Sequence, residues 1–198
     1  MLDRFVEALT GRRLGGALFV LCGLVVAAVV LWPDGDDGDS ATPKVAPVRI
    51  VSVPQLGISF AHPRAWRRTI VKRVIQLRSP DGAAVLTFAS PVAGAHTLQV
   101  QADLKAELRK RFPRAKVVRN GPARLGSRDG RSLELSGIGA GGRMRVLVVI
   151  ASTRFRTYAA TLLTPARPSA KRLAEVQQIL RTVRLTEPTA KPVVASDG

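Results

Sequence analysis

The residues of this chain best suited to metal binding or acid–base chemistry are its two histidines, His62 and His96. A zinc site requires three or four histidine, cysteine or carboxylate ligands, usually at short spacings. Neither histidine has such neighbours, and Asp103, seven residues after His96, matches no ligand pattern. The sequence therefore predicts no metal site.

Nucleophilic catalysis has no better support. The single cysteine, Cys22, lies in a long apolar segment, and no G-x-S-x-G motif presents a nucleophilic serine. The acidic residues that follow the segment form no motif that pairs two carboxylates for acid–base work. We therefore predict no catalytic residues and no enzyme activity. A hydrolase whose site assembles from distant positions is the alternative.

A glycine-rich stretch, Gly137-Ile-Gly-Ala-Gly-Gly142, contains the letters of a dinucleotide-binding fingerprint. That fingerprint works only where its glycines open a helix whose N-terminus holds the pyrophosphate. Residues 143–151 instead have a strand pattern, in which Met144, Val146, Val148 and Ile150 alternate with Arg145, Leu147 and Val149 as in a central strand. The stretch therefore predicts a hairpin loop, and no cofactor is expected.

Basic clusters are the remaining candidates for a binding site. Aromatic residues, which would stack on bases, make up only 5% of the chain, so nucleic acid is not a predicted partner. A solvated polar face explains most clusters. The sharper hypothesis is an anion-binding segment over residues 109–119. The clusters are Arg64, Arg67 and Arg68; Lys72 and Arg73; Arg109, Lys110, Arg111, Arg114, Lys116 and Arg119; and Arg143, Arg145, Arg154 and Arg156.

The balance of charge is strongly positive. The chain carries a net charge of +17, and the part from Lys44 onward carries about +20 because the residues before it hold six acidic side chains and only three basic ones. Such a field attracts polyanions. Outside a cell these are anionic lipid, wall polymer or acidic envelope proteins. A compositional bias toward arginine would produce the same numbers without any binding role.

Residues 14–32 form an apolar segment without a charged side chain. As a helix they would span about 28 Å, close to the hydrocarbon thickness of a bilayer. Arg12 and Arg13 precede the segment, and Pro33 and four aspartates follow it. Because basic residues stay in the cytoplasm, the sequence predicts a single-pass anchor in the cytoplasmic membrane with the C-terminal domain outside. Cleavage of a signal peptide near Ala28 is the alternative.

The rest of the chain divides by composition. Residues 1–13 are a short cytoplasmic segment, and residues 33–47 are an acidic linker rich in proline and glycine that has nothing to bury. Residues 48–186 are predicted to form one extracytoplasmic domain, and residues 187–198 a disordered polar tail.

Within the domain, strands are expected at residues 49–53, 58–62, 70–78, 83–89, 116 onward, 132–136, 144–150 and 155–163. Turns are expected at residues 79–82 and 129–130. Apolar residues at helical spacing predict a helix from Thr97 to Phe112, with Glu107 and Arg111 paired on its outer side, and a final helix capped by Ser169 whose buried face holds Leu173, Val176, Leu180 and Val183. The fold class is therefore α+β, an antiparallel sheet flanked by helices and preceded by one transmembrane helix.

The stretch Gly57-Ile-Ser-Phe-Ala-His-Pro-Arg-Ala-Trp66 resembles the opening motif of the PsbP-like family, and the order of elements over residues 49–186 is similar. The resemblance implies an α/β/α sandwich, a role in scaffolding or binding, and no catalytic residues. Gly57, Pro63 and Trp66 are the matching positions. A structural role is expected for them, with ligand stacking on Trp66 as the alternative.

These observations predict a non-enzymatic binding or accessory domain of the cell envelope, held to the membrane by its anchor. The alternative is direct electrostatic binding to anionic lipid or wall polymer through the basic face.

Overall fold

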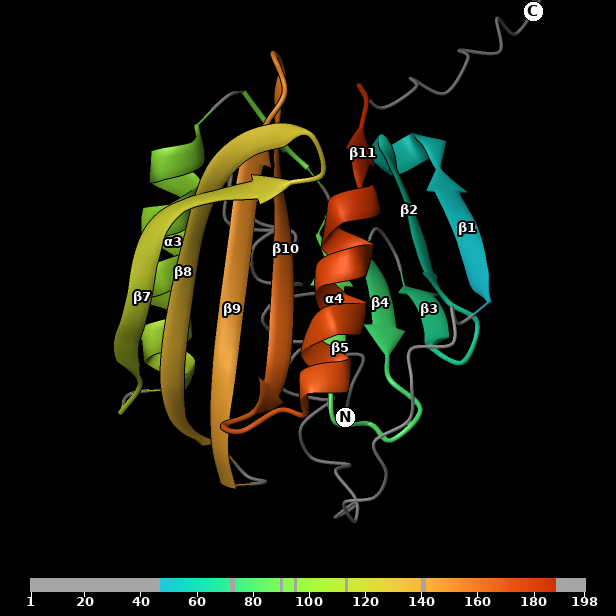
Figure 1. Ribbon diagram of the computed structural model, residues 1–198. Coiled ribbons are helices and arrows are strands. Elements are labelled where there is room, and N and C mark those ends of the chain that lie inside the picture. The colour runs from blue at the N-terminus through green and yellow to red at the C-terminus, as the bar shows by residue number, and fades with distance from the viewer. Residues whose placement is uncertain are drawn as a thin grey trace, which may run out of the picture.

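The computed structural model describes residues 47–71, 74–89, 91–94, 96–112, 114–139 and 142–187 (Figure 1). The predicted cytoplasmic segment, membrane anchor, most of the linker and the tail lie outside these residues, as do Lys72 and Arg73. Among the described helices, none combines the length and the apolar character needed to cross a bilayer.

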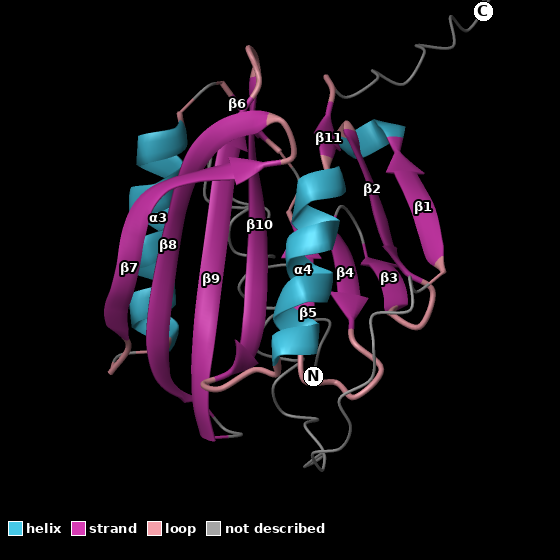
Figure 2. Ribbon diagram, in the orientation of Figure 1, coloured by secondary structure: helices cyan, strands magenta, loops and turns pink. Residues whose placement is uncertain are grey.

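Antiparallel strands make up most of the domain, and two helices accompany them (Figure 2). In chain order the elements are β1 (Val48–Val53), η1 (Pro54–Leu56), β2 (Ile58–Pro63), β3 (Arg67–Val71), β4 (Val74–Arg78), β5 (Val85–Phe88), β6 (Val92–Ala93), α3 (Thr97–Arg111), β7 (Lys116–Leu125), β8 (Arg128–Gly139), β9 (Gly142–Ser152), β10 (Arg156–Pro165), α4 (Ala170–Thr182) and β11 (Arg184–Leu185).

The strands form two sheets. A three-stranded sheet has the order β1-β2-β11, and an eight-stranded sheet has the order β3-β4-β5-β10-β9-β8-β7, with β6 paired to β10. Phe60 of β2 stacks on Phe88 of β5, with ring centroids 4.8 Å apart. This contact packs the small sheet against the large one.

The helices cover opposite faces of the large sheet. Alternate residues of β9 show this directly, because Val148 and Ile150 belong to the apolar cluster that contains α3, whereas Val149 and Ala151 belong to the cluster that contains α4 and the small sheet. The predicted α+β class with helices flanking an antiparallel sheet is confirmed.

Helix α3 buries the face that its sequence predicts. Val100, Leu104, Leu108 and Phe112 are all buried against β8 and β9. Glu107 is also buried, with only 8% of its surface exposed, so the expectation that it lies on the outer side of the helix is wrong.

The predicted single strand over residues 70–78 is instead a hairpin. Strands β3 and β4 pair antiparallel, with Val71 opposite Val74 and Arg67 opposite Arg78. The sequence conceals the reversal because both strands share the same alternation and no glycine, proline or asparagine separates them. The next turn, at residues 79–82, is confirmed: the amide of Gly82 donates to the carbonyl of Ser79 at 2.9 Å, and φ at Gly82 is 71°.

The turn predicted at residues 129–130 lies elsewhere. Leu125 pairs with Arg128, so β7 and β8 are joined through Gly126, whose φ is 60°. Gly130 lies inside β8 opposite Ala151, and a Cβ atom there would stand 1.9 Å from the carbonyl oxygen of Ile150. Glycine is required at this position by the close approach of two strands rather than by a turn.

Helix α4 begins where predicted, because the Ser169 hydroxyl accepts the amide of Arg172 at 3.3 Å. Val176, Ile179 and Val183 form its buried face. Leu173 was expected there but is 40% exposed. The short strand β11, which pairs with β2, was not predicted.

Candidate functional site

The opening motif places Trp66 between the sheets and α4. Gly57 ends η1 in the left-handed conformation, with a φ of 63° that favours glycine. Pro63 ends β2, and its carbonyl accepts the amide of Trp66 at 3.0 Å. The indole of Trp66 is then only 3% exposed.

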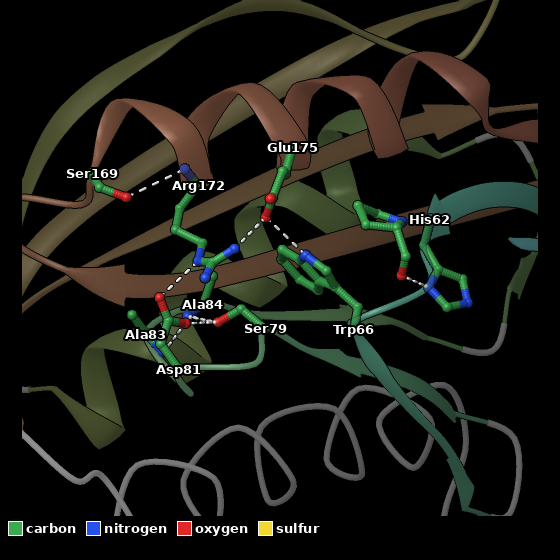
Figure 3. A network of polar contacts seen from close by, with 10 residues as sticks. His62, Trp66, Ser79, Asp81, Ala83, Ala84, Ser169, Arg172 and Glu175 are labelled. Carbon is green, nitrogen blue, oxygen red and sulfur yellow. Dashed lines mark hydrogen bonds and ion pairs between the residues drawn. The ribbon is translucent and has the colours of Figure 1, made fainter. Parts of the chain in front are cut away.

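A polar network centred on Arg172 extends from one side of this indole (Figure 3). The Trp66 Nε1–H donates to Oε2 of Glu175 at 2.9 Å, and Nη1 of Arg172 donates to the same oxygen at 2.6 Å. Nε of Arg172 donates to Oδ2 of Asp81 at 2.7 Å. Asp81 also accepts the Ser79 hydroxyl at 2.5 Å. We call these five residues the Arg172 network.

The contacts of the Arg172 network attach α4 to the turn between β4 and β5. Burial alone would raise the pKa of Asp81, but the hydrogen bonds from Ser79 and Arg172 outweigh it and hold that pKa below its usual value. The Ser79 hydroxyl accepts the amide of Ala84 while donating to Asp81, and because Arg172 also donates to Asp81 and lowers its pKa, this carboxylate is a weak base. The network joins α4 to the β4–β5 turn, and the burial of Trp66 favours its structural role over ligand stacking.

His62 is buried in β2 and takes no part in that network. Its Nδ1 hydrogen-bonds the carbonyl of Pro63 at 2.8 Å, and since a carbonyl can only accept, Nδ1 carries the proton. Nε2 is buried and has no partner in the described part of the chain. Burial lowers the pKa of His62, and the nearby charges of Arg68 and Arg49 lower it further. The imidazole is therefore neutral near pH 7.

His96 lies apart from His62, exposed at the start of α3, where its backbone amide donates to Oγ1 of Thr157 at 3.0 Å. The described residues contain no group of three or more histidine, cysteine or acidic side chains that would hold a metal ion. The glycine-rich stretch joins β8 to β9, with Gly139 opposite Gly142, and a strand follows it. The predicted hairpin is confirmed there.

The anion-binding segment predicted over residues 109–119 runs from the end of α3 into the edge strand β7. Arg109, Lys110 and Arg114 are exposed, and Nζ of Lys110 lies 3.6 Å from Glu107. The side chain of Arg111 lies outside the described atoms. Lys116 and Arg119 are exposed at the start of β7.

Sheet register separates the two halves of this segment. Lys116 lies opposite Ser136 and Arg119 opposite Glu134, while the residues that alternate with these in β8, Leu133 and Leu135, contact α3. Directly opposed residues share a face, so Lys116 and Arg119 lie on the face away from α3. On that face Arg145 lies opposite Ser136, and its Nη1 is 3.3 Å from Glu134.

A second basic region gathers where the described chain begins, on β1, β3 and the turn that follows β2. The Arg64 amide donates to the carbonyl of Pro47 at 2.9 Å, Arg49 lies opposite His62, and Arg68 also acts on the His62 ring. We call it the N-terminal basic surface. It consists of Arg49, Arg64, Arg67 and Arg68 with the exposed apolar residues Val48, Ile50, Ile70 and Val71.

Sequence reasoning found only part of this surface. The sequence shows the cluster of Arg64, Arg67 and Arg68, but it places Arg49, Ile50, Ile70 and Val71 in ordinary predicted strands and Val48 just before one. The lack of any acidic residue between Pro47 and Pro80 was the available signal.

No protein-family model matches the chain, and no curated protein sequence matches it. Solved structures do resemble it. Cyanobacterial PsbP (CyanoP) from Synechocystis sp. PCC 6803 has a TM-score of 0.56 at 12% identity, over 75% of this chain and 98% of that one. The Ran-binding protein Mog1p of Saccharomyces cerevisiae has a TM-score of 0.46 at 6% identity, over 71% and 96%. The type VI secretion immunity protein TplEi of Pseudomonas aeruginosa has 0.42 at 18% identity, over 70% and 48%.

The similarity to CyanoP spans almost all of that protein and confirms the predicted PsbP-like fold. At 12% identity it concerns the fold alone.

Proposed function

We propose that this chain is a non-enzymatic binding or accessory domain, anchored in the cytoplasmic membrane by residues 14–32 and presented outside the cell to an anionic partner in the envelope. The observation that carries this proposal is the distribution of charge. Within the described residues, most carboxylates form ion pairs with cations of the domain, whereas many exposed arginines form none.

The ion pairs account for most of the acidic side chains described. Arg172 holds Asp81 and Glu175, Lys110 pairs with Glu107, Arg124 with Asp129, and Arg145 with Glu134. Exposed cations that form no ion pair within the described residues are Arg49, Arg64, Arg67, Arg68, Arg109, Arg114, Lys116, Arg119, Arg128, Arg143, Arg154, Arg167, Lys171, Arg181 and Arg184. Such a surface recruits anions.

Anchoring is supported by the apolar length of residues 14–32 and by the charges on either side of them. The non-enzymatic role is supported by the environments of the groups best suited to catalysis: His62 is buried and hydrogen-bonded to a backbone carbonyl, and the Ser79 hydroxyl is fixed by two hydrogen bonds.

A second candidate function is electrostatic attachment to anionic lipid or wall polymer through the segment over residues 109–119. The exposure of Arg109, Arg114, Lys116 and Arg119 favours it. The division of these cations between two faces of the sheet weakens it, because a flat polyanion would contact only one face at a time.

Protease treatment of intact spheroplasts tests the proposed topology. With an epitope tag at the C-terminus, added protease should remove the tag while a cytoplasmic marker stays intact. Survival of the tag until the cells are lysed would refute the extracytoplasmic placement. Release of a soluble domain that begins near Ala28 would show a cleaved signal peptide in place of the anchor.

A further inference from the structure

We propose that the N-terminal basic surface docks on the anionic phospholipid headgroups of the membrane that carries the anchor. This inference rests on the proposed function, because the anchor is what brings the surface to that membrane. It assigns lipid contact to β1, β3 and the turn after β2, and not to the segment over residues 109–119.

The charge of this surface is uncompensated. Between Pro47 and Pro80 the sequence has seven lysines and arginines and no aspartate or glutamate. Arg49, Arg64, Arg67 and Arg68 are exposed, and no ion pair within the described residues involves them. The planar guanidinium group of arginine suits bidentate contact with phosphate.

Three segments of the chain carry the four arginines, namely β1, the turn after β2, and β3. Arg64 is tied to the start of β1 through its hydrogen bond to Pro47. Arg49 lies opposite His62 in the small sheet, and the charges of Arg49 and of Arg68, which belongs to the large sheet, both lower the pKa of that ring, so both lie near it. The cations of three separate segments thus converge at one edge of the molecule.

Exposed apolar side chains occupy the same two edge strands as these cations. Because neighbouring residues of a strand point to opposite faces, Val48 and Ile50 face away from Arg49, and the residues share the strand edges rather than one face. Ile50 is 79% exposed, Val48 42%, Ile70 46% and Val71 40%. Strands β1 and β3 are the edge strands of their sheets, and the simplest role for arginine on an edge is to prevent aggregation. That role does not explain the exposed apolar side chains of the same edge strands, which would promote aggregation. Cationic and apolar side chains together are typical of surfaces that lie at a bilayer interface.

The position of this surface in the chain, next to the predicted linker, indicates that its binding partner is the membrane. Strand β1 begins at Val48, directly after the predicted linker of residues 33–47. A fully extended linker of that length reaches about 50 Å, so the predicted anchor keeps the N-terminal end of the domain within that distance of the membrane. Strand β7, which carries Lys116 and Arg119, lies at the opposite lateral edge (Figure 1).

Hydrogen exchange of the full-length chain tests the inference. The chain is reconstituted in vesicles of phosphatidylcholine alone and in vesicles that also contain phosphatidylglycerol. Amides of β1 and β3 should exchange more slowly in the anionic vesicles, and the difference should disappear in 1 M salt, where the Debye length falls to ~3 Å. Each cation near an anionic surface strengthens attachment roughly fivefold. Replacing four should therefore abolish the protection.

The test variant carries Arg49→Gln, Arg64→Gln, Arg67→Gln and Arg68→Gln. A matched control carries Arg109→Gln, Arg114→Gln, Lys116→Gln and Arg119→Gln, which removes the same charge from exposed positions. Protection that survives in the control and is lost in the test variant supports the inference. Equal loss in both variants, or loss in the control alone, overturns it.

Two further outcomes separate the inference from the proposed function. If the chain floats with neutral vesicles in high salt but its amides show no lipid-dependent protection, the anchor is supported and lipid docking by this surface is overturned. A chain that fails to float with them has no anchor, and both proposals fall. The amide protection could also be equal in both lipids and disappear in a variant with Asp34→Asn, Asp36→Asn, Asp37→Asn and Asp39→Asn. That result would show that the acidic linker binds this surface, and it would overturn lipid docking.

Discussion

Arg172 is the side chain on which the attachment of α4 depends most. It bridges Asp81 and Glu175, and its own side chain is only 12% exposed. Replacing it with methionine leaves two nearby carboxylates without their cation. An exposed ion pair contributes about 0–1 kcal/mol and breaking a buried one costs about 3–5 kcal/mol. For this half-buried pair we expect a loss of about 2 kcal/mol in the free energy of unfolding.

Chemical denaturation followed by circular dichroism measures this loss. Arg124→Met is the matched control, because Arg124 and Asp129 form an ion pair whose side chains are 70% and 83% exposed, and its loss should cost less than about 1 kcal/mol. The pKa of Asp81, followed by NMR, should rise in Arg172→Met. Equal costs for the two variants would show that the Arg172 network does not anchor α4.

His62 should make the stability of the domain depend on pH. Burial lowers its pKa in the folded state, so between that value and about 6.5 the unfolded chain binds more protons. The free energy of unfolding should therefore be greatest above about pH 6.5 and decrease as the pH falls below it. Protonation is opposed by the charges of Arg49 and Arg68, and no carboxylate in the described residues offsets them.

Unfolding free energies measured from pH 8 to pH 5 check this prediction. His62→Gln should flatten the dependence, whereas the same change at the exposed His96 should leave it in place. Asp81, whose pKa is lowered from 3.8, contributes only at more acidic pH. A slope that persists in His62→Gln would assign the pH dependence to another group.

At the scale of the elements, close strand contacts decide where glycine is needed. Gly130→Ala would place a Cβ atom 1.9 Å from a backbone oxygen of β9, and backbone cannot move aside as a flexible side chain can. We expect the pairing of β8 with β9 to distort and the free energy of unfolding to fall by about 2 kcal/mol or more.

Gly121→Ala in the neighbouring strand β7 is the control. A Cβ atom at Gly121 meets nothing within 4 Å, so this change should be neutral or stabilise by up to about 1 kcal/mol through the unfolded state. Thermal melts of both variants compare them directly. Similar destabilisation at the two positions would contradict the close-approach explanation.

At the scale of the whole molecule, repulsion among cations opposes compaction. With a net charge of +17, the folded chain brings like charges together, and added salt screens them. Raising sodium chloride from 0.1 M to 1 M should therefore increase the free energy of unfolding. The gain should be smaller when Arg109, Arg114, Lys116 and Arg119 are replaced by glutamine. Stability that falls with salt would show that the ion pairs outweigh the repulsion.

Local patterns in the sequence determined several elements by themselves. The four-residue spacing from Val100 to Phe112 sets the buried face of α3, and Ser169 sets the start of α4. The turn at residues 79–82 follows from the conformations that proline and glycine prefer. In each case the interactions that decide the local structure are made by residues that lie close together in the sequence.

Contacts between distant segments were decided only by the tertiary structure. Trp66 and Glu175 are 109 positions apart, and Arg172 and Asp81 are 91 apart. Lys116 and Arg119 follow Arg114 closely, yet they lie on the face away from α3 because pairing with β8 fixes their direction. The sequence alone indicated a basic, PsbP-like domain with local elements in place. Strand register and packing, which depend on partners far along the chain, determined which cations share a surface and which glycines are required.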